Sequence, residues 1–228
     1  MIGVLVNVAS IAVGATIGVI LKRFLSEKIT SAVMTALGLA TFLIGVKGAI
    51  KVERELLFSI SLALGTVIGT IIDIDKYVNQ FGEFLKSTFA KNANDKSFAE
   101  AFANASILFA VGAMSVIGSI NAGLKHDYNI LYLKSTLDFM AAVMFGASMG
   151  IGVAFSALTI LVFEGAIAIL AGGLTFLAED PALMNEFSAV GNLLVAVIGL
   201  NLIGVTKIKL ANMLPAIVVV VILYRIIV

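Results

Sequence analysis

The chain has 228 residues, of which 61% are hydrophobic and only 13% are charged, and its mean hydropathy is +1.12. Soluble domains contain roughly 45–50% apolar and about 25% charged residues, so a water-soluble fold is excluded and a lipid bilayer is the expected solvent. The net charge of +1 argues against nucleic-acid binding, and the lack of cysteine with a single histidine, His126, excludes disulfides and a His/Cys metal site.

Eight apolar runs are long enough to cross a bilayer, which needs about 20 mostly apolar residues per helix. We expect membrane-spanning helices at residues 2–21, 31–50, 56–74, 102–124, 131–153, 155–177, 187–206 and 210–228. The alternative count is seven, if one run is re-entrant. The first run is followed, not preceded, by basic residues, which is typical of a retained span rather than a cleaved leader.

Two details of the later spans follow from their composition. The fifth and sixth runs are nearly continuous, so a tight turn is expected near residues 152–156. Pro215 lies near the start of the last span, where its missing N–H is least damaging.

The segment 75–101 differs from the spans because it mixes aromatic and charged residues. Phe81, Phe84, Leu85 and Phe89 recur at helical spacing and form one apolar stripe. We therefore expect an amphipathic connector helix on the membrane surface. Asp73 and Asp75 close the third span and are expected to pair with Lys76.

The distribution of Lys and Arg predicts the orientation in the membrane. One face would carry nine: Lys22, Arg23, Lys28, Lys76, Lys86, Lys91, Lys96, Lys207 and Lys209. The other would carry six, namely Lys47, Lys51, Arg54, Lys125, Lys134 and Arg225, with an acidic loop of Glu179, Asp180 and Glu186. We expect a multi-pass protein of the cell inner membrane with both termini outside and the connector in the cytoplasm.

Three segments of the first half resemble three segments of the second half, in the same order. NVASIAVGA (7–15) resembles NASILFAVGA (104–113), KITSAVMTALG (28–38) resembles KSTLDFMAAVM (134–144), and LFSISLALG (57–65) resembles AFSALTILVFEG (154–165). We infer two three-helix repeats, 1–74 and 102–177, joined by the connector 75–101 and followed by a helical hairpin at 178–228. An odd number of spans per repeat makes the copies inverted, which is typical of transporters and some channels.

Three glycine pairs are spaced four residues apart within the apolar runs: Gly14/Gly18, Gly65/Gly69 and Gly146/Gly150. Small residues at this spacing let helix backbones approach closely in lipid. Close packing inside the bundle or between subunits is the simpler interpretation, and a hinge or exposed backbone site is the functional one. The glycines therefore permit a homo-oligomer without requiring it.

Lys134 and Asp138 begin an otherwise apolar helix and lie four residues apart, so they share one helix face. Ionised side chains at depth are expensive unless they are paired and face the bundle interior. Ser135 lies beside them. The group is either an ion pair that fixes the depth of the helix, or a substrate or gating site where the repeats meet.

Glu164 is the only charged residue between residues 152 and 173. A lone carboxylate near the centre of a span costs roughly 2.5–3.5 kcal/mol on insertion scales. It is a candidate proton- or cation-coupling group, or else a neutral acid bonded to a neighbouring helix. Lys47 or Lys134 could be its partner. Asn7 and Asn104 occupy equivalent repeat positions and could line a polar pathway.

GAMSVIGSINAGLKHDYNILYLKSTLDFMAAVMFG from residue 112 and SAVGNLLVAVIGLNLIGVTKIKLANMLPAI from residue 188 resemble domain-of-unknown-function family 554. The resemblance extends over nearly the whole chain, and the K-S-x-x-D stretch at Lys134 and the late Leu214-Pro215 are its most distinctive parts. Family members are multi-pass membrane proteins of bacteria and archaea, sometimes labelled transport proteins. The resemblance thus implies the architecture but no mechanism.

Together these observations predict an all-α polytopic membrane helix bundle that is not an enzyme and has no catalytic residues, metal site or cofactor. The leading hypothesis is a secondary transporter or channel for a small solute or ion. Its pathway residues would be Asn7, Asn104, Lys134, Ser135, Asp138 and Glu164. The alternative is a membrane scaffold that binds lipid or a partner protein through the connector and the glycine faces.

Overall fold

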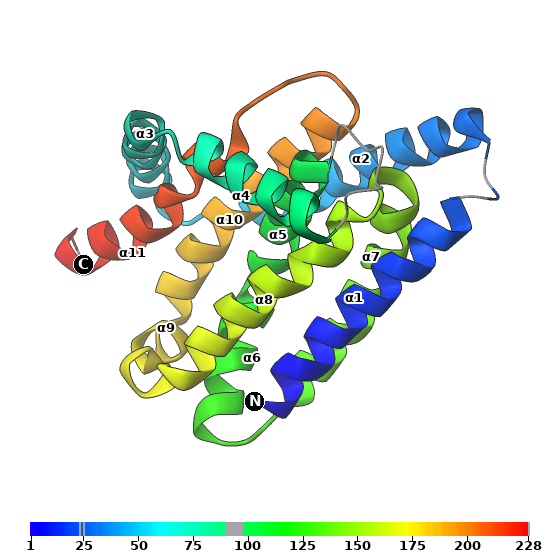
Figure 1. Cartoon of the computed structure of the whole chain (residues 1–228). Coiled ribbons are helices and arrows are strands. Elements are labelled where there is room, and N and C mark those ends of the chain that lie inside the picture. The colour runs from blue at the N-terminus through cyan, green and yellow to red at the C-terminus, as the bar shows by residue number, and fades with distance from the viewer. Residues whose placement is uncertain (23, 25, 90–97, 228) are drawn as a thin grey trace.

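A computed structural model describes residues 1–22, 24, 26–89 and 98–227, and all regular secondary structure formed by these residues is helical (Figure 1). The α-helices are α1 (Ile2–Lys22), α2 (Glu27–Ala49), α3 (Glu55–Ile72), α4 (Ile74–Phe89), α5 (Phe98–Ala110), α6 (Ala113–Leu124), α7 (Asn129–Met149), α8 (Gly152–Ile169), α9 (Thr175–Glu179), α10 (Pro181–Leu202) and α11 (Pro215–Ile227). Two short 3₁₀ turns, η1 (Ala171–Gly173) and η2 (Leu210–Met213), precede α9 and α11.

The expected set of membrane spans is present in the described residues. Seven helices are long and apolar enough to cross a membrane, with η2 and α11 counted as one of them. The pair α5 and α6 is bent by 64° at residues 111–112 and makes an eighth span if it is counted as one broken helix rather than as a re-entrant segment. The alternative counts of seven and eight therefore differ only in how this broken helix is counted.

Several boundaries differ from the expectation. The turn between the fifth and sixth spans lies at Gly150, with φ of 91°, and Ile151, because a glycine at positive φ ends α7; residues 152–156 are already helical. The sixth span ends at Ile169 rather than near 177, and η1 and α9 follow it. The seventh begins at Pro181, where the Asp180 side chain accepts a hydrogen bond from the Leu183 N–H.

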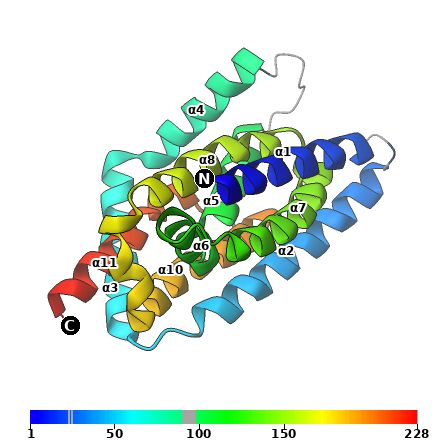
Figure 2. The same cartoon turned by 90° about the horizontal axis from the view of Figure 1, so that it is seen from below.

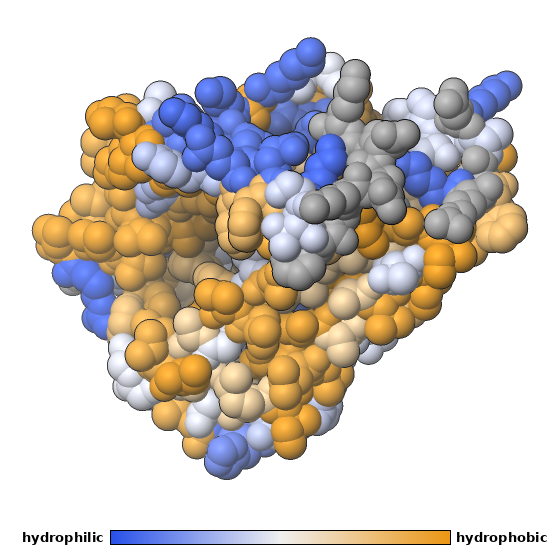
Figure 3. All heavy atoms as spheres, viewed as in Figure 1, coloured by the Kyte–Doolittle hydropathy of each residue, from blue (hydrophilic) through white to orange (hydrophobic). Residues whose placement is uncertain are grey.

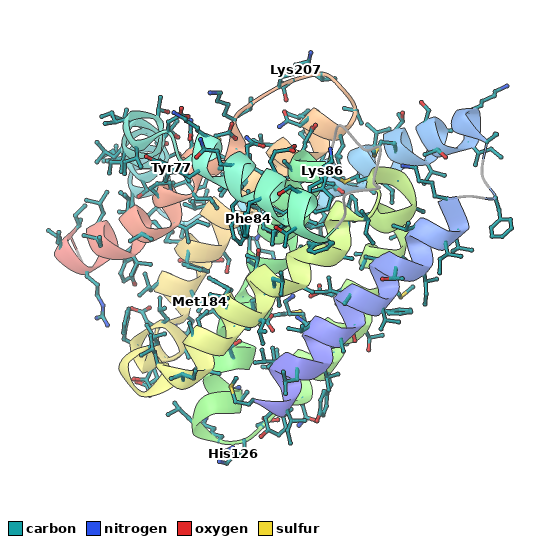
Figure 4. The ribbon with its side chains drawn as sticks, in the orientation of Figure 1. Tyr77, Phe84, Lys86, His126, Met184 and Lys207 are labelled. Carbon is teal, nitrogen blue, oxygen red and sulfur yellow. The ribbon has the colours of Figure 1, made fainter. Side chains whose placement is uncertain are left out.

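A broad apolar belt covers the face of the molecule seen in Figure 3, with polar surface gathered mainly at its two ends. Large apolar side chains such as Leu56, Ile71 and Val162 are at least 70% exposed, as expected for residues that face lipid. Lys86 and Lys207 lie at the end that carries α4, and His126 lies at the opposite end (Figure 4). We call these ends the connector face and the His126 face.

The Lys-rich segments predicted to share one side lie together on the connector face, although Arg23, Lys91 and Lys96 lie outside the described residues (Figure 1). One of the expected ion pairs there is different. Asp73 lies 3.8 Å from Lys209 rather than pairing with Lys76, because its left-handed conformation ends α3 and begins α4 beside η2. The Asp75 carboxylate accepts a hydrogen bond from Asn79 instead.

The connector helix α4 lies across one end of the bundle and packs on α5 (Figure 2). Leu85, on the predicted apolar stripe, is 3% exposed and packs against Phe98 and Phe102. Phe98 begins α5, so the connector is shorter than residues 75–101, because these aromatic rings belong to the bundle core. The Asn212 side chain accepts a hydrogen bond from the Asp75 N–H at 2.8 Å and ties α4 to η2.

Glycine-lined contacts join each N-terminal helix to a helix from the second half of the chain. A Cβ at Gly18 of α1 would lie 2.1 Å from the Val143 carbonyl oxygen of α7, and one at Gly69 of α3 would lie 2.0 Å from the Asn212 carbonyl oxygen. In α2, Gly45 approaches Ala196 of α10 in the same way. Packing within the bundle is therefore confirmed for two of the predicted pairs, and the α2–α10 contact is an additional one.

The inverted repeat stays a prediction. Repeat symmetry would match α1 with α5 and α6, and α2 with α7. The extensive α1–α7 contact should then have a counterpart between α2 and the broken helix, and the described residues form no comparable contact there.

Candidate functional site

Three charged side chains that are buried or nearly so, Lys134, Asp138 and Glu164, lie together where α1, α6, α7 and α8 meet. Lys134 and Asp138 form an ion pair within α7, so the predicted shared face is confirmed. The Lys134 ammonium also lies 3.6 Å from Oε1 of Glu164 on α8. Lys47 is exposed, so Lys134 is the cation that faces Glu164. A lysine between two carboxylates therefore links two spans that are close in sequence but separated by a turn.

Glu164 is completely buried, and two neutral side chains complete its surroundings. Asn7 of α1 donates from Nδ2 to both carboxylate oxygens, at 3.1 Å and 3.3 Å. Ser115 of α6 donates to Oε1 at 2.9 Å. A buried carboxylate is tolerated only when such partners replace its water, and α1, α6 and α7 together supply them.

The break between α5 and α6 places Ser115 in this cluster. Gly112 has φ of 140°, a conformation that side chains rarely adopt, and it ends the helical path at Ala110. The second half-helix begins at Ala113, so Ser115 lies in its first turn, and its single O–H can donate either to Glu164 or to the Phe109 carbonyl oxygen, which lies 3.1 Å from Oγ. Non-helical backbone at membrane depth is tolerated where it lines a cavity or is buried in protein.

The charge cluster, defined as Asn7, Ser115, Lys134, Asp138 and Glu164, lies in the half of the bundle nearer the His126 face. Each of its members is five to nine residues from the end of its helix on that face. At 1.5 Å per residue, this corresponds to a depth of about 7–14 Å within a hydrocarbon layer of about 30 Å. Because α8 ends at Ile169, Glu164 is closer to this end than the sequence indicated.

A pocket of about 650 Å³ reaches the cluster from α2 and α10. Figure 2 shows four of the helices that line it, α2, α6, α7 and α10, from the His126 face, and residues of α5 and α9 complete the lining. Its polar lining consists of Lys51, Ser115, Lys134, Asp138, Asn185, Ser188 and Asn192. Met184, labelled in Figure 4, belongs to its apolar lining. Glu164 does not line the pocket, but three of its cluster partners do, so the pocket ends one side chain short of it.

Two predicted pathway residues lie apart from the cluster's hydrogen bonds. The Ser135 hydroxyl is buried and donates to the Leu131 carbonyl oxygen of its own helix at 2.7 Å. Asn104 lies on α5, and its buried Nδ2 has no hydrogen-bond partner among the residues that the structure describes. Ser115 and Gly112 are the residues that sequence reasoning missed. Two serines and two glycines within residues 112–119 were the available signal for an irregular helix.

Two members of the predicted acidic loop have structural roles instead. Glu186 is 1% exposed within α10, and its Oε1 accepts hydrogen bonds from the N–H groups of Glu53 and Arg54 at 3.1 Å and 2.9 Å. It therefore caps α3, whose own first residues provide no side-chain cap. The Leu183 N–H beside Asp180 holds the pKa of that carboxyl below its ordinary value, with a smaller contribution from the Tyr224 hydroxyl.

A second cavity lies on the other side of the broken helix. This apolar groove of about 720 Å³ is lined by α4, α5, α8, α10 and α11, including Phe81, Phe163 and Val218. Ser106 and Thr159 provide polar atoms there, and their hydroxyls bond to each other at 2.9 Å. The surface below α4 is hollowed at this place (Figure 3).

Comparison with known proteins supports the same architecture. Residues 2–225 match the profile of a family described as a protein of unknown function, DUF554. The chain is 30% identical over 220 residues to the uncharacterized membrane protein YdfK of Bacillus subtilis (strain 168), covering 95% of this chain and 92% of that protein. It is 31% identical over 219 residues to the uncharacterized protein YqgA of Escherichia coli (strain K12), covering 95% and 93%. No solved structure shows a significant match.

Proposed function

We propose that this chain, which belongs to the DUF554 family and is an integral membrane protein, is a secondary transporter or channel for a small solute or ion. One observation carries the proposal: a buried cluster of three charged side chains borders a pocket at a broken transmembrane helix. Discontinuous helices of this kind form the binding sites of many transporters. Lys134, Asp138 and Glu164 would line or couple the pathway, without enzymatic chemistry.

The chemistry of the pocket favours a small polar solute or an ion. Lys134 and Asp138 offer one charge of each sign, and the amide side chains of Asn185 and Asn192 offer both donors and acceptors. Ionisable groups inside a membrane are expensive, and they are typically found where a substrate or ion passes. A purely structural ion pair would need no pocket of this volume beside it.

The proposal extends to orientation. Nine of the fifteen Lys and Arg residues belong to the sequence segments predicted to share the connector side, so we assign that face to the cytoplasm and both termini to the outside of the cytoplasmic membrane. The pocket then lies in the outer half of the bundle. Transport across the membrane requires a second conformation that opens the cluster toward the connector face, and the flexible backbone at Gly112 is suited to that movement.

Ligand-induced thermal stabilisation tests this function. The purified protein would be heated with each member of a panel of ions, amino acids and small metabolites. A ligand that binds only the folded state at 100 times its dissociation constant stabilises it by about 2.7 kcal/mol. We expect a stabilising ligand whose effect is lost in Asp138→Asn or Glu164→Gln but retained in Glu83→Gln, an exposed carboxylate on α4. If the stabilisation is equal in all four proteins, the charge cluster is not the binding site.

A lipid-binding scaffold is the second candidate, and the apolar groove favours it. The groove borders lipid-facing helices below an amphipathic helix, so its occupant would be a phospholipid acyl chain. Ala103→Trp would fill the groove, and we expect less co-purified phospholipid per protein by native mass spectrometry. Unchanged lipid content would remove the support for this candidate.

A further inference from the structure

The charge cluster is not electrically balanced. Lys134 contributes one positive charge, and Asp138 and Glu164 contribute two negative charges. The groups that α1 and α6 present to the carboxylates, Asn7 and Ser115, are neutral. Among the described residues, Lys134 is the cation paired with either carboxylate, and Lys51 at the pocket wall is exposed. The fully ionised cluster therefore carries a net charge of −1 in a largely buried site that borders the pocket.

One buried acceptor in the cluster has no partner among the described residues. Asn7 is completely buried and donates from Nδ2 to Glu164, but its Oδ1 accepts no hydrogen bond from the part of the chain that the structure describes. The Asn7 side chain also lies close enough to the Asp138 carboxylate to interact with it. An unsatisfied buried oxygen is destabilising, and a protonated carboxyl group turned toward it would give it a donor.

We propose that the cluster holds one exchangeable proton, shared between Asp138 and Glu164, with Asn7 Oδ1 as an acceptor for the protonated carboxyl group. The proton balances the charge and satisfies the free oxygen in one step. A metal ion fits less well, because Glu164 is surrounded by N–H and O–H donors and the described residues contain no group of three or more His, Cys, Asp or Glu ligands. The transport proposed above would then be coupled to this proton, and only that coupling role rests on the proposed function.

Asp138 is the point of exchange with water. Its side chain is 13% exposed and borders the pocket, whereas that of Glu164 is fully buried. On release, the carboxyl O–H bond breaks, the electron pair stays on the carboxylate, and the proton passes to water in the pocket. The cluster then changes from neutral to a net charge of −1, which is the change that a proton-coupled transporter uses.

Infrared difference spectroscopy of the purified protein tests the proton site without any transported substrate. At pH 7 ordinary Asp and Glu side chains, with pKa near 4, are ionised and give no carboxylic-acid C=O band. We expect one such band in the wild type and its loss in both Asp138→Asn and Glu164→Gln, because either change leaves one carboxylate facing one ammonium. Lys134→Met should give a band of roughly double intensity, since both carboxyl groups must then be neutral. Glu83→Gln should leave the band unchanged.

The wild-type spectrum is decisive even if a variant fails to fold, because the absence of a band at pH 7 overturns the proposal. A band that persists in both single variants would also overturn it, since burial rather than charge balance would then hold the proton. The ligand panel separates this inference from the proposed function. If the carboxylic-acid band is present but no ligand stabilises the protein, the proton site stands and the transport proposal falls. If a ligand stabilises the protein but the band is absent, only the proton proposal falls.

Discussion

Gly18→Ala should separate α1 from α7 and destabilise the bundle. The added Cβ would lie 2.1 Å from the Val143 carbonyl oxygen and 2.7 Å from the Ala147 nitrogen, and both are backbone atoms of α7. A Cβ contact below 3.0 Å essentially never occurs, so the two helices must move apart by about 0.9 Å. Overpacking of this kind costs about 1–3 kcal/mol, and we expect the upper half of that range because the backbone cannot rotate away.

Gly165→Ala on α8 is the matched control, because its Cβ would meet only the Met1 side chain, at 3.8 Å. Both substitutions gain the same helix propensity, about 1 kcal/mol in water, so the difference between the variants isolates the clash. The assay is unfolding in mixed detergent micelles, followed by helical circular dichroism. Equal unfolding free energies for the two variants would refute the α1–α7 contact as described.

Three further predictions concern charged residues. Lys134→Met should lower the unfolding free energy by about 3–5 kcal/mol at neutral pH and by less in acid, because the folded variant must bind one proton more than the folded wild type to neutralise both carboxyl groups; the same unfolding assay measures this. Asp180 has a lowered pKa in the folded state, so its stabilising effect is complete above its ordinary pKa and is lost as pH falls through the folded value. The stability of wild type relative to Asp180→Asn should therefore decline only below about pH 4, by thermal melts across pH. Glu186→Ala should cost about 1–3 kcal/mol and accelerate amide hydrogen exchange at Glu53 and Arg54.

Each of these predictions has a result that contradicts it. A constant cost of Lys134→Met across pH would mean that the carboxylates are not what Lys134 neutralises. If the stability of wild type and of Asp180→Asn depends on pH in the same way, Asp180 does not contribute to the loss of stability in acid. Glu186→Gln keeps an acceptor oxygen and should retain most of the stability, so equal losses for Gln and Ala would argue against capping of α3.

The spans could be predicted because the bilayer requires long apolar runs, and each of them can be recognised in the sequence without its neighbours. The same holds for the Lys134–Asp138 pair, since four-residue spacing places two side chains together on any helix. The α2–α10 contact could not be found in this way. Gly38 and Gly45 are seven residues apart, and nothing in α2 indicates which distant helix they approach.

The sequence predicted the charged residues of the candidate site, but not the side chains and the helix break that surround them. Lys134 was one of two possible partners of Glu164, and only packing decides between it and Lys47. The break at Gly112 was missed because an isolated glycine in an apolar run usually continues the helix, and Ser115 was missed with it. Glu186 was assigned to a loop because its role depends on the N–H groups of Glu53 and Arg54, more than 130 residues earlier.

The pairing of early helices with late ones has a consequence for biosynthesis. α1 packs mainly on α7, α2 on α10 and α3 on α11, so the first three helices leave the ribosome long before their partners exist. Contacts between residues so distant in sequence form late and slowly. We expect the N-terminal half to wait in the membrane as separate helices, with the groups that Glu186 later caps still hydrated, and to be vulnerable to proteolysis until α10 inserts. A nascent chain that stops before residue 181 should therefore be degraded, whereas the full chain should assemble.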